Sequence, residues 1–313
     1  MSISKKFKKR SIVALLLCLI GFYAGVFHVA PAIILHPRRM SEVKLIEYFG
    51  DIPLPSANNQ KSTYVSIPTK DGICLSSWLL QPKEASAQGT LIFIHGIGGS
   101  KEFQLKYAEA FVDLGLNVVV FDLRAHGQSG GENCTYGYCE KHDVSSIIDW
   151  LTASGVEGQI GLYGTSLGGA IALQTAAIDD RIDFLIIEST FATLEEVTFA
   201  YMDRISPASS KYISGLALAA AGRKGGFEPD SIKPELAAAQ ISIPVFMSHG
   251  TADVHIPIKQ GRRNFDHLKS SLKEWHPIRG ADHNSVHAVG GKSYQNEIEQ
   301  FILNQFSSFQ ECQ

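Results

Sequence analysis

Hydrophobic and polar residues follow successive patterns along this chain, and each pattern predicts a different structure. An apolar run, broken only by two glycines, a histidine and a proline, covers residues 12–35. At about 1.5 Å per residue, a helix over this run is long enough to cross a bilayer core of about 30 Å. Residues 41–60 are polar and contain Pro53 and Pro55, which predicts a connector without regular structure. From residue 61 to residue 313, short apolar runs alternate with longer helical ones.

The region after residue 60 has the pattern of one large α/β domain. Its first two strands are joined by Asp71-Gly72, a dipeptide typical of hairpins. The later strands are short and apolar on both faces, which is typical of a parallel sheet covered by helices on both sides. We predict strands at 63–67, 73–80, 90–94, 117–121, 160–163, 184–187, 245–247 and 274–278, and helices at 102–114, 140–151, 167–178, 258–268 and 294–306.

The alternation of strand and helix stops at about residues 191–240. Helical sequence rich in Ala, Gly and Ser fills residues 209–226, and two prolines follow it. An insertion at this place would lie after the strand at 184–187. We predict that it forms a lid over a pocket and that substrate selectivity resides there.

Basic residues flank the apolar run near the N-terminus. Five Lys or Arg residues precede it and two follow it, while residues 1–40 contain no acidic residue. This charge distribution predicts a cytoplasmic N-terminus and a catalytic region on the other side of the membrane. Ala30-Pro31-Ala32 imitates the cleavage site of a signal peptide, but the apolar run is longer than a signal peptide needs. We therefore predict a single-pass anchor over residues 1–40, with a cleaved signal peptide as the alternative.

The rest of the chain is acidic. Residues 41–313 hold 21 basic and 31 acidic residues, a net charge of −10. This excess argues against nucleic acid as a partner, because phosphate binding needs a basic face. The five cysteines form no zinc or redox pattern, and we predict no metal site and no cofactor. Cys134 and Cys139 flank a short turn and either form a disulfide or remain free thiols.

One pentapeptide carries the strongest chemical signal. A short apolar strand and an apolar helix flank the sequence Gly164-Thr165-Ser166-Leu167-Gly168. This strand–turn–helix context is that of a nucleophile elbow. A serine on such a sharp turn takes strained dihedrals, so residues without a Cβ are needed where strand and helix approach each other. The helix directs its first amides toward the place where negative charge would develop. An ordinary Gly/Ser turn is the alternative.

Two further motifs extend this pattern. The predicted strand at 90–94 is followed by His95-Gly96-Ile97-Gly98-Gly99. The predicted strand at 117–121 is followed by Asp122-Leu123-Arg124-Ala125-His126-Gly127-Gln128-Ser129. With the elbow, they resemble the α/β-hydrolase superfamily over about 250 residues, most closely its serine-aminopeptidase-like and monoacylglycerol-lipase-like branch. Ala125 stands where that branch usually has glycine, which questions the local turn conformation. The resemblance implies the α/β-hydrolase fold, a mostly parallel, doubly wound sheet with a helical lid insertion, here preceded by one transmembrane helix.

The resemblance also implies which residues act. In this fold the nucleophile is followed by an acid and then by a histidine. The matching positions are Ser166, then Asp253 after the strand at 245–247, then His283 after the last strand. The backbone N–H groups of Ile97 and Leu167 would form the oxyanion hole.

Other side chains near these positions offer alternatives. Asp282 is a weaker candidate for the acid, because a neighbour in sequence rarely faces the same imidazole. His255 and His287 could replace His283 as the base, although neither begins the loop after the last strand. His95 and His249 precede glycines at strand ends, and we predict that they bond nearby backbone groups.

These observations predict a membrane-anchored serine hydrolase that cleaves carboxylic esters through a Ser-His-Asp triad and an acyl-enzyme. Its substrate would be a small-molecule or lipid-like acyl compound. A peptidase or amidase of the same fold, an acyltransferase, and a non-catalytic binding protein that retains the fold are the alternatives.

Overall fold

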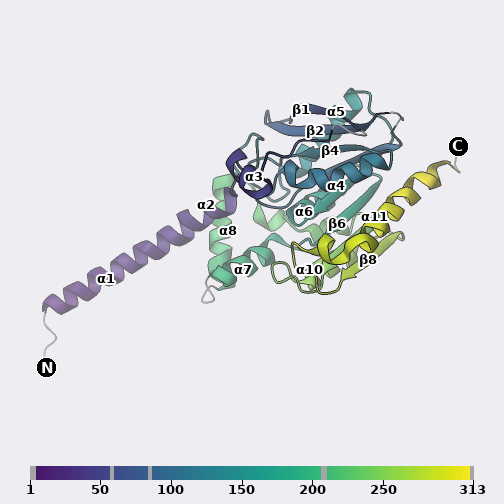
Figure 1. Ribbon diagram of the computed structural model, residues 1–313. Helices are drawn as coiled ribbons and strands as arrows, with labels where there is room; N and C mark the ends of the chain where they lie inside the picture. Colours follow the sequence, from purple (N-terminus) through teal and green to yellow (C-terminus); the bar gives the residue numbers. More distant parts are fainter. Residues whose placement is uncertain (1–4, 57–59, 84–86, 206–209, 311–313) are drawn as a thin grey trace.

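The computed structural model describes residues 5–56, 60–83, 87–205 and 210–310. Its centre is one eight-stranded sheet with the order β1-β2-β4-β3-β5-β6-β7-β8 (Figure 1). The pairs β1·β2 and β2·β4 are antiparallel, and the other pairs are parallel. The strands are β1 (Gln60–Pro68), β2 (Cys74–Pro82), β3 (Gly89–Ile94), β4 (Asn117–Phe121), β5 (Gln159–Thr165), β6 (Phe184–Glu188), β7 (Val245–Gly250) and β8 (Lys273–Ile278). The mostly parallel sheet predicted from the sequence is confirmed.

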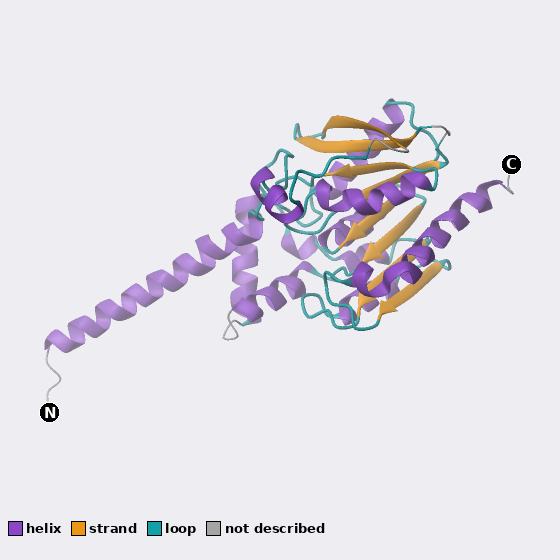
Figure 2. Ribbon diagram, viewed as in Figure 1, coloured by secondary structure: helices purple, strands orange, loops and turns teal. Residues whose placement is uncertain are grey.

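Helices cover both faces of this sheet (Figure 2). The apolar side chains of β3 alternate between two cores: Ile92 and Ile94 pack with residues of α5 and α6, whereas Leu91 and Phe93 pack with residues of α4 and α11. A strand buried on both faces needs apolar residues at every position, which explains the continuous apolar runs. The helices are α4 (Lys101–Asp113), α5 (Glu140–Ala153), α6 (Leu167–Ala176), α10 (Ile258–His267) and α11 (Val286–Gln310, bent at Gly291).

A helical insertion stands between β6 and β7, where the sequence predicts one. It contains α7 (Leu194–Ile205), α8 (Lys211–Gly225), the short 3₁₀ helix η2 (Pro229–Ser231) and α9 (Pro234–Ala238). Helix α8 lies within the predicted helical sequence at 209–226, whereas α7 was not predicted. Ser210 caps α8, since its hydroxyl accepts a hydrogen bond from the Ile213 N–H at 3.2 Å.

The prediction for residues 41–60 was wrong in part, because they contain helix α3 (Glu42–Phe49). The Ser41 hydroxyl accepts a hydrogen bond from the Lys44 N–H, and Gly50 ends the helix in the left-handed region at φ 82°. These are ordinary start and stop signals. The two prolines that argued against regular structure follow the helix and do not interrupt it.

The N-terminal apolar run forms one long helix that projects from the domain (Figures 1 and 2). It consists of α1 (Lys5–Ala24), a π-helical turn η1 (Gly25–Val29) and α2 (Ala30–Leu35). The helical stretch from Arg10 to Leu35 is 26 residues long, and an 18-residue window within it has a mean hydropathy of 2.4. The helix therefore fits the predicted single membrane span, and by length and composition it equally fits a signal sequence. Its last part packs against α8 beside the sheet edge.

Candidate active site

Ser166 occupies the sharp turn between β5 and α6. Its dihedrals, φ 56° and ψ −116°, lie outside the regions that L-residues prefer. The Ser166 N–H donates a hydrogen bond to the Glu188 carbonyl at the end of β6, at 2.8 Å. A Cβ on Gly168 would lie 1.9 Å from the Ile94 carbonyl oxygen, and one on Gly164 would lie 2.3 Å from the Gly168 oxygen. The two glycines of the pentapeptide are therefore required for strand and helix to approach.

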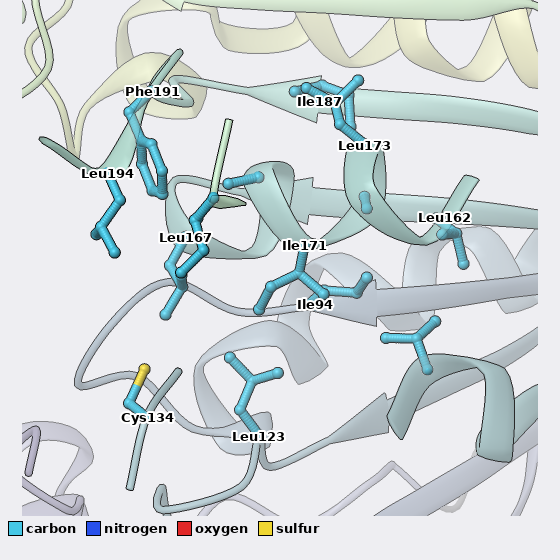
Figure 3. Close-up of a cluster of buried hydrophobic side chains, with 14 of the residues drawn as sticks. Ile94, Leu123, Cys134, Leu162, Leu167, Ile171, Leu173, Ile187, Phe191 and Leu194 are labelled. Atoms are coloured by element: carbon cyan, nitrogen blue, oxygen red, sulfur yellow. The ribbon is translucent and has the colours of Figure 1, made fainter. Parts of the chain in front are cut away.

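Apolar side chains pack around the turn and helix that follow Ser166. Figure 3 shows Leu167 and Ile171 of α6 among Ile94, Leu123 and other apolar side chains of neighbouring elements. Because this cluster is close-packed, the turn that carries Ser166 has little freedom to relax. The strained conformation of the serine is thus held by its surroundings.

His283 and Asp253 lie where the resemblance implies. The His283 Nε2 atom is 2.9 Å from the Ser166 Oγ, and its Nδ1 atom is 2.7 Å from the Asp253 Oδ2. The other carboxylate oxygen of Asp253 accepts hydrogen bonds from the N–H groups of His255 and Ile256, at 2.9 and 2.8 Å. The structure therefore brings the three predicted side chains into one chain of hydrogen bonds at the carboxyl end of the sheet.

The environment of Asp253 keeps its carboxylate ionised. Burial raises the pKa of this group, but the adjacent His249 imidazole and the hydrogen bond from His283 outweigh it and hold the pKa well below its usual value. A carboxylate that stays charged at neutral pH can fix the orientation of the His283 ring and stabilise a positive charge on it.

The two backbone N–H groups predicted to form the oxyanion hole belong to Leu167 and Ile97. Leu167 is the first residue of α6, so its N–H has no acceptor within the helix. Ile97 follows β3, and no hydrogen bond from its N–H is found among the described residues. A Cβ on Gly96 would lie only 3.3 Å from the Cβ of Ser166, which shows how closely this loop passes the serine. Both predicted oxyanion donors thus lie on segments that adjoin the Ser166 side chain.

His95 holds the loop that carries Ile97. Its Nε2 accepts a hydrogen bond from the Leu123 N–H at 3.0 Å, and its Nδ1 donates one to the Gly96 carbonyl at 2.7 Å. Burial, with a smaller effect of His126, lowers the pKa of His95 to about 3, so the ring is neutral. The predicted structural role of His95 is confirmed by these backbone contacts.

The motif after β4 ties this loop to the rest of the domain. Asp122 accepts hydrogen bonds from the N–H groups of Lys101 and Gln128 at 2.8 and 2.9 Å, and the Lys101 ammonium contacts it at 2.8 Å. Arg124 donates to Asp143 of α5 at 2.6 Å. Ala125 has a φ of 60°, so the left-handed turn persists with alanine in place of glycine.

The remaining candidate side chains have other contacts. The His249 Nε2 donates to the Ile256 carbonyl at 2.8 Å, which confirms backbone bonding. The His255 Nδ1 accepts a hydrogen bond from Arg204 at 2.6 Å. The Asp282 carboxylate is turned toward the N–H of Asn284, at 3.0 Å. None of these three side chains contacts the Ser166 hydroxyl in the described part of the chain.

The sequence indicated His287 as an alternative base, but its pairing with Glu188 was not predicted. His287 Nε2 lies 3.1 Å from the Glu188 carboxylate and 2.8 Å from the Tyr163 hydroxyl. The Tyr294 hydroxyl donates to the same carboxylate at 3.0 Å. Burial raises the pKa of Glu188, but the charge and hydrogen bond of His287 outweigh it and lower the pKa. The signal in the sequence that could have indicated this pairing is the glutamate that ends the apolar run of β6.

In the part of the chain that the structure describes, the cysteines and acidic side chains form neither a disulfide nor a metal site. Cys134 is buried, Cys139 is half-buried, and both are free thiols. Among the described residues, no group of three or more His, Cys, Asp or Glu side chains is placed to hold a metal ion.

Two cavities meet at Ser166. One, of about 490 Å³, is apolar and is bounded by α7 on one side and by the N-terminal helix on the other. The second, of about 910 Å³, is more polar and is bounded by α3, α4 and the residues around His283 and His287. Both volumes lie within the range of about 300–1,000 Å³ typical of ligand sites. Ser166, Ile97 and Tyr201 line both cavities.

Comparison with known proteins agrees with this architecture. A family model described as the alpha/beta hydrolase fold matches residues 89–210. An uncharacterized protein, YqkD, of Bacillus subtilis is 28% identical over 249 residues, which cover 78% of this chain and 80% of that protein. Protein bem46 of Schizosaccharomyces pombe is 26% identical over 257 residues, 80% of each chain.

Among solved structures, an esterase of Pyrococcus furiosus superposes with a TM-score of 0.68 at 21% identity and covers 87% of this chain and 98% of its own. The sheet order, the elbow and the matched family model agree with one another. This chain has the α/β-hydrolase fold, and residues 89–210 match the family model of that fold.

Proposed function

We propose that this protein is a membrane-anchored serine hydrolase that cleaves carboxylic esters. The observation that carries the proposal is the chain of hydrogen bonds from Ser166 through His283 to Asp253, at 2.9 and 2.7 Å. A serine hydroxyl is a weak nucleophile at neutral pH, and a histidine oriented by a buried carboxylate is the usual means of activating it. Esters are the favoured substrates because the solved structures similar to this chain include esterases.

The proposed reaction has two steps. Ser166 Oγ attacks the acyl carbonyl carbon while His283 Nε2 takes its proton, and Asp253 stabilises the imidazolium. The N–H groups of Ile97 and Leu167 stabilise the negative charge on the carbonyl oxygen. The imidazolium then gives its proton to the departing alcohol as the bond to the leaving oxygen breaks. Water, deprotonated by His283, then attacks the carbonyl carbon of the acyl-serine. The bond from that carbon to Ser166 Oγ breaks, the His283 imidazolium returns the proton to Oγ, and the acid leaves.

The other parts of the chain receive roles that follow from this proposal. Residues 1–40 would anchor the protein with a cytoplasmic N-terminus, because the positive charges cluster before the apolar run. Residues 41–60 would connect the anchor to a catalytic domain at 61–313. The insertion at 191–240 would act as a lid, since its helix α7 borders the apolar cavity beside Ser166.

A labelling experiment on washed membranes tests the activity and the anchor together. Membranes that contain the full chain are washed with alkaline carbonate and then treated with a fluorophosphonate probe. We expect labelling in the pellet, its loss in Ser166→Ala, and at least a 10³-fold loss of ester hydrolysis in that variant. Ser146→Ala is the control, because this buried serine lies on α5 and bonds only the His142 carbonyl.

The outcomes separate the two parts of the proposal. Labelled protein in the wash would remove the anchor but not the hydrolase. Undiminished labelling of Ser166→Ala would remove the assigned nucleophile. A parallel assay with an aminoacyl amide distinguishes an esterase from a peptidase, and labelled protein without turnover of either substrate would indicate an acyltransferase.

A further inference from the structure

The apolar cavity beside Ser166 has a wall that does not belong to the sheet or to the insertion. Gly25, Val29 and Ile33 of the N-terminal helix line one side of it, opposite Met202 and Ile205 of α7. Ser166 and Leu167 also line this cavity. The predicted membrane anchor therefore forms part of the space into which a group bound to the serine would extend.

Specific contacts fix the helix in this position. The Leu35 carbonyl accepts a hydrogen bond from the Cys134 N–H at 2.8 Å, and the Ile34 carbonyl accepts one from the Tyr136 hydroxyl at 2.8 Å. Val26 and Leu35 are buried. Leu35 packs so closely on α8 that a Cβ on Gly225 would lie 2.5 Å from its Cδ2. The end of the helix is thus built into the catalytic domain.

The length of the helix indicates where the cavity lies relative to the bilayer. A span of about 20 residues is needed to cross the hydrocarbon core. Counted from Ser11, the first residue after the basic cluster, such a span ends near residue 30. Gly25 and Val29 then lie within the leaflet farther from the N-terminus, at the level of the acyl chains.

Three apolar side chains that line the cavity are also exposed at the surface, which means that the cavity opens beside them. Val29, Ile33 and Ile205 are exposed by 55%, 65% and 79%. Apolar groups with this exposure are unfavourable against water and favourable against lipid. The opening of the cavity is therefore more stable in contact with lipid than in contact with water.

We propose that the anchor helix forms one wall of the acyl-binding site and that the substrates are long-chain acyl esters taken directly from the membrane leaflet. The acyl chain enters between the N-terminal helix and α7, and its carbonyl reaches Ser166 from the apolar side. The head group lies in the more polar cavity. The inference rests on the proposed hydrolase for the chemistry at Ser166, but the chain-binding site is defined by the geometry alone.

Two glycines of the same helix provide a matched test. Gly25 lines the cavity, and a Cβ added to it meets no atom within 4 Å. Gly21 lies one helical turn earlier, is exposed, does not line the cavity, and also has no atom within 4 Å of an added Cβ. Because the space around each Cβ is open, Gly25→Trp should extend into the chain site and obstruct it, and Gly21→Trp should leave it open. Gly25→Leu gives a smaller obstruction.

The assay uses the full chain in phosphatidylcholine vesicles with palmitoylglycerol or butyrylglycerol as substrate. In the wild type, kcat/KM should be higher for palmitoylglycerol than for butyrylglycerol, because only the palmitoyl chain is long enough to fill the cavity. We expect Gly25→Trp to lower the palmitoyl-to-butyryl ratio of kcat/KM at least about tenfold, Gly25→Leu to lower it less, and Gly21→Trp to leave it unchanged. An unchanged ratio in Gly25→Trp, or an equal loss on both substrates, overturns the inference.

A second measurement does not depend on turnover. Vesicles that contain a palmitoyl lipid with a diazirine at the end of its chain are irradiated with the Ser166→Ala protein. We expect cross-links in the α7 peptide that contains Met202, and their loss in Ser166→Ala/Gly25→Trp. If the wild type hydrolyses neither ester but the cross-links form, the proposed function fails and the acyl site stands. If esters are hydrolysed but no α7 cross-link forms, the acyl site fails and the hydrolase stands.

Discussion

The two cavities that meet at Ser166 differ in what builds them. The apolar one is enclosed by α7 and by the last turns of the N-terminal helix. The more polar one is enclosed by α3 and α4 and contains His255, His287 and Glu188. None of the helices named here contributes the nucleophile, which lies on the turn between β5 and α6.

Different parts of the molecule would carry out the chemical reaction and select the substrate. Residues at the carboxyl ends of β5, β7 and β8 would perform the chemistry, because a close-packed sheet holds them within hydrogen-bond distance. Segments outside the sheet would choose the substrate, one cavity for the acyl chain and the other for the leaving group. A substitution at the sheet edge should then affect all substrates alike, whereas a substitution in one cavity should affect one part of the substrate.

The largest effect is expected from Asp253→Asn. The amide can no longer stabilise the imidazolium and favours the wrong tautomer of His283, which lies 2.7 Å away. We expect kcat/KM to fall about 10³–10⁴-fold, by the same factor for palmitoyl and butyryl esters. Steady-state kinetics on both esters measure this. Asp282→Asn is the control, because the Asp282 carboxylate is exposed and bonds the backbone of its own turn. A loss confined to one chain length would contradict the division of tasks.

Much of the sheet and its order of elements could be predicted from the sequence. Strands buried on both faces, such as the one that contains Ile92, need continuous apolar runs, and this need leaves a clear pattern. The elbow was predictable for a related reason: only glycine fits at Gly164 and Gly168, where a Cβ would lie within 2.3 Å of backbone oxygen. The structure is most predictable from the sequence at positions where few residue types are tolerated.

Helix α3 could have been predicted from its cap residues, Ser41 and Gly50, but the prolines nearby outweighed them. The docking of the N-terminal helix could not, because buried Leu35 and exposed Leu16 are the same residue in the same kind of run. The pairing of Glu188 with His287 was equally hidden, since spacing along a chain does not determine which side chains face each other. Contacts between separately predicted elements are what sequence patterns omit.

A smaller effect is expected on stability, at the loop that separates the cavities. The pKa of His95, about 3 in the folded protein, lies below the unfolded value of about 6.5. Between these values only the unfolded state binds the proton, so stability falls as the pH falls. From pH 7 to pH 5 this residue should lower the free energy of unfolding by about 2 kcal/mol.

Denaturant unfolding of the detergent-solubilised protein measures this slope. His95→Gln removes the titrating group, so we expect the free energy of unfolding of that variant to depend less on pH over the same range. Other buried histidines titrate in both proteins, and the difference between the two slopes therefore reports His95. Equal slopes would show that His95 is protonated in the folded state.

The smallest effect tests the polar cavity, as the counterpart of the Gly25 variants. His287 lines this cavity and keeps 19% of its side chain exposed, close to Glu188. An imidazole held in this way can bond a hydroxyl of a glycerol leaving group, a contact worth about 1.4 kcal/mol. His287→Ala should therefore raise KM for butyrylglycerol about tenfold and leave KM for p-nitrophenyl butyrate unchanged, because the second leaving group has no such hydroxyl. His287→Gln, which retains a hydrogen-bonding side chain, should recover part of the loss. Since both esters have the same acyl group, an equal rise in KM for the two would place the effect at Ser166 itself and remove the distinction between the two cavities.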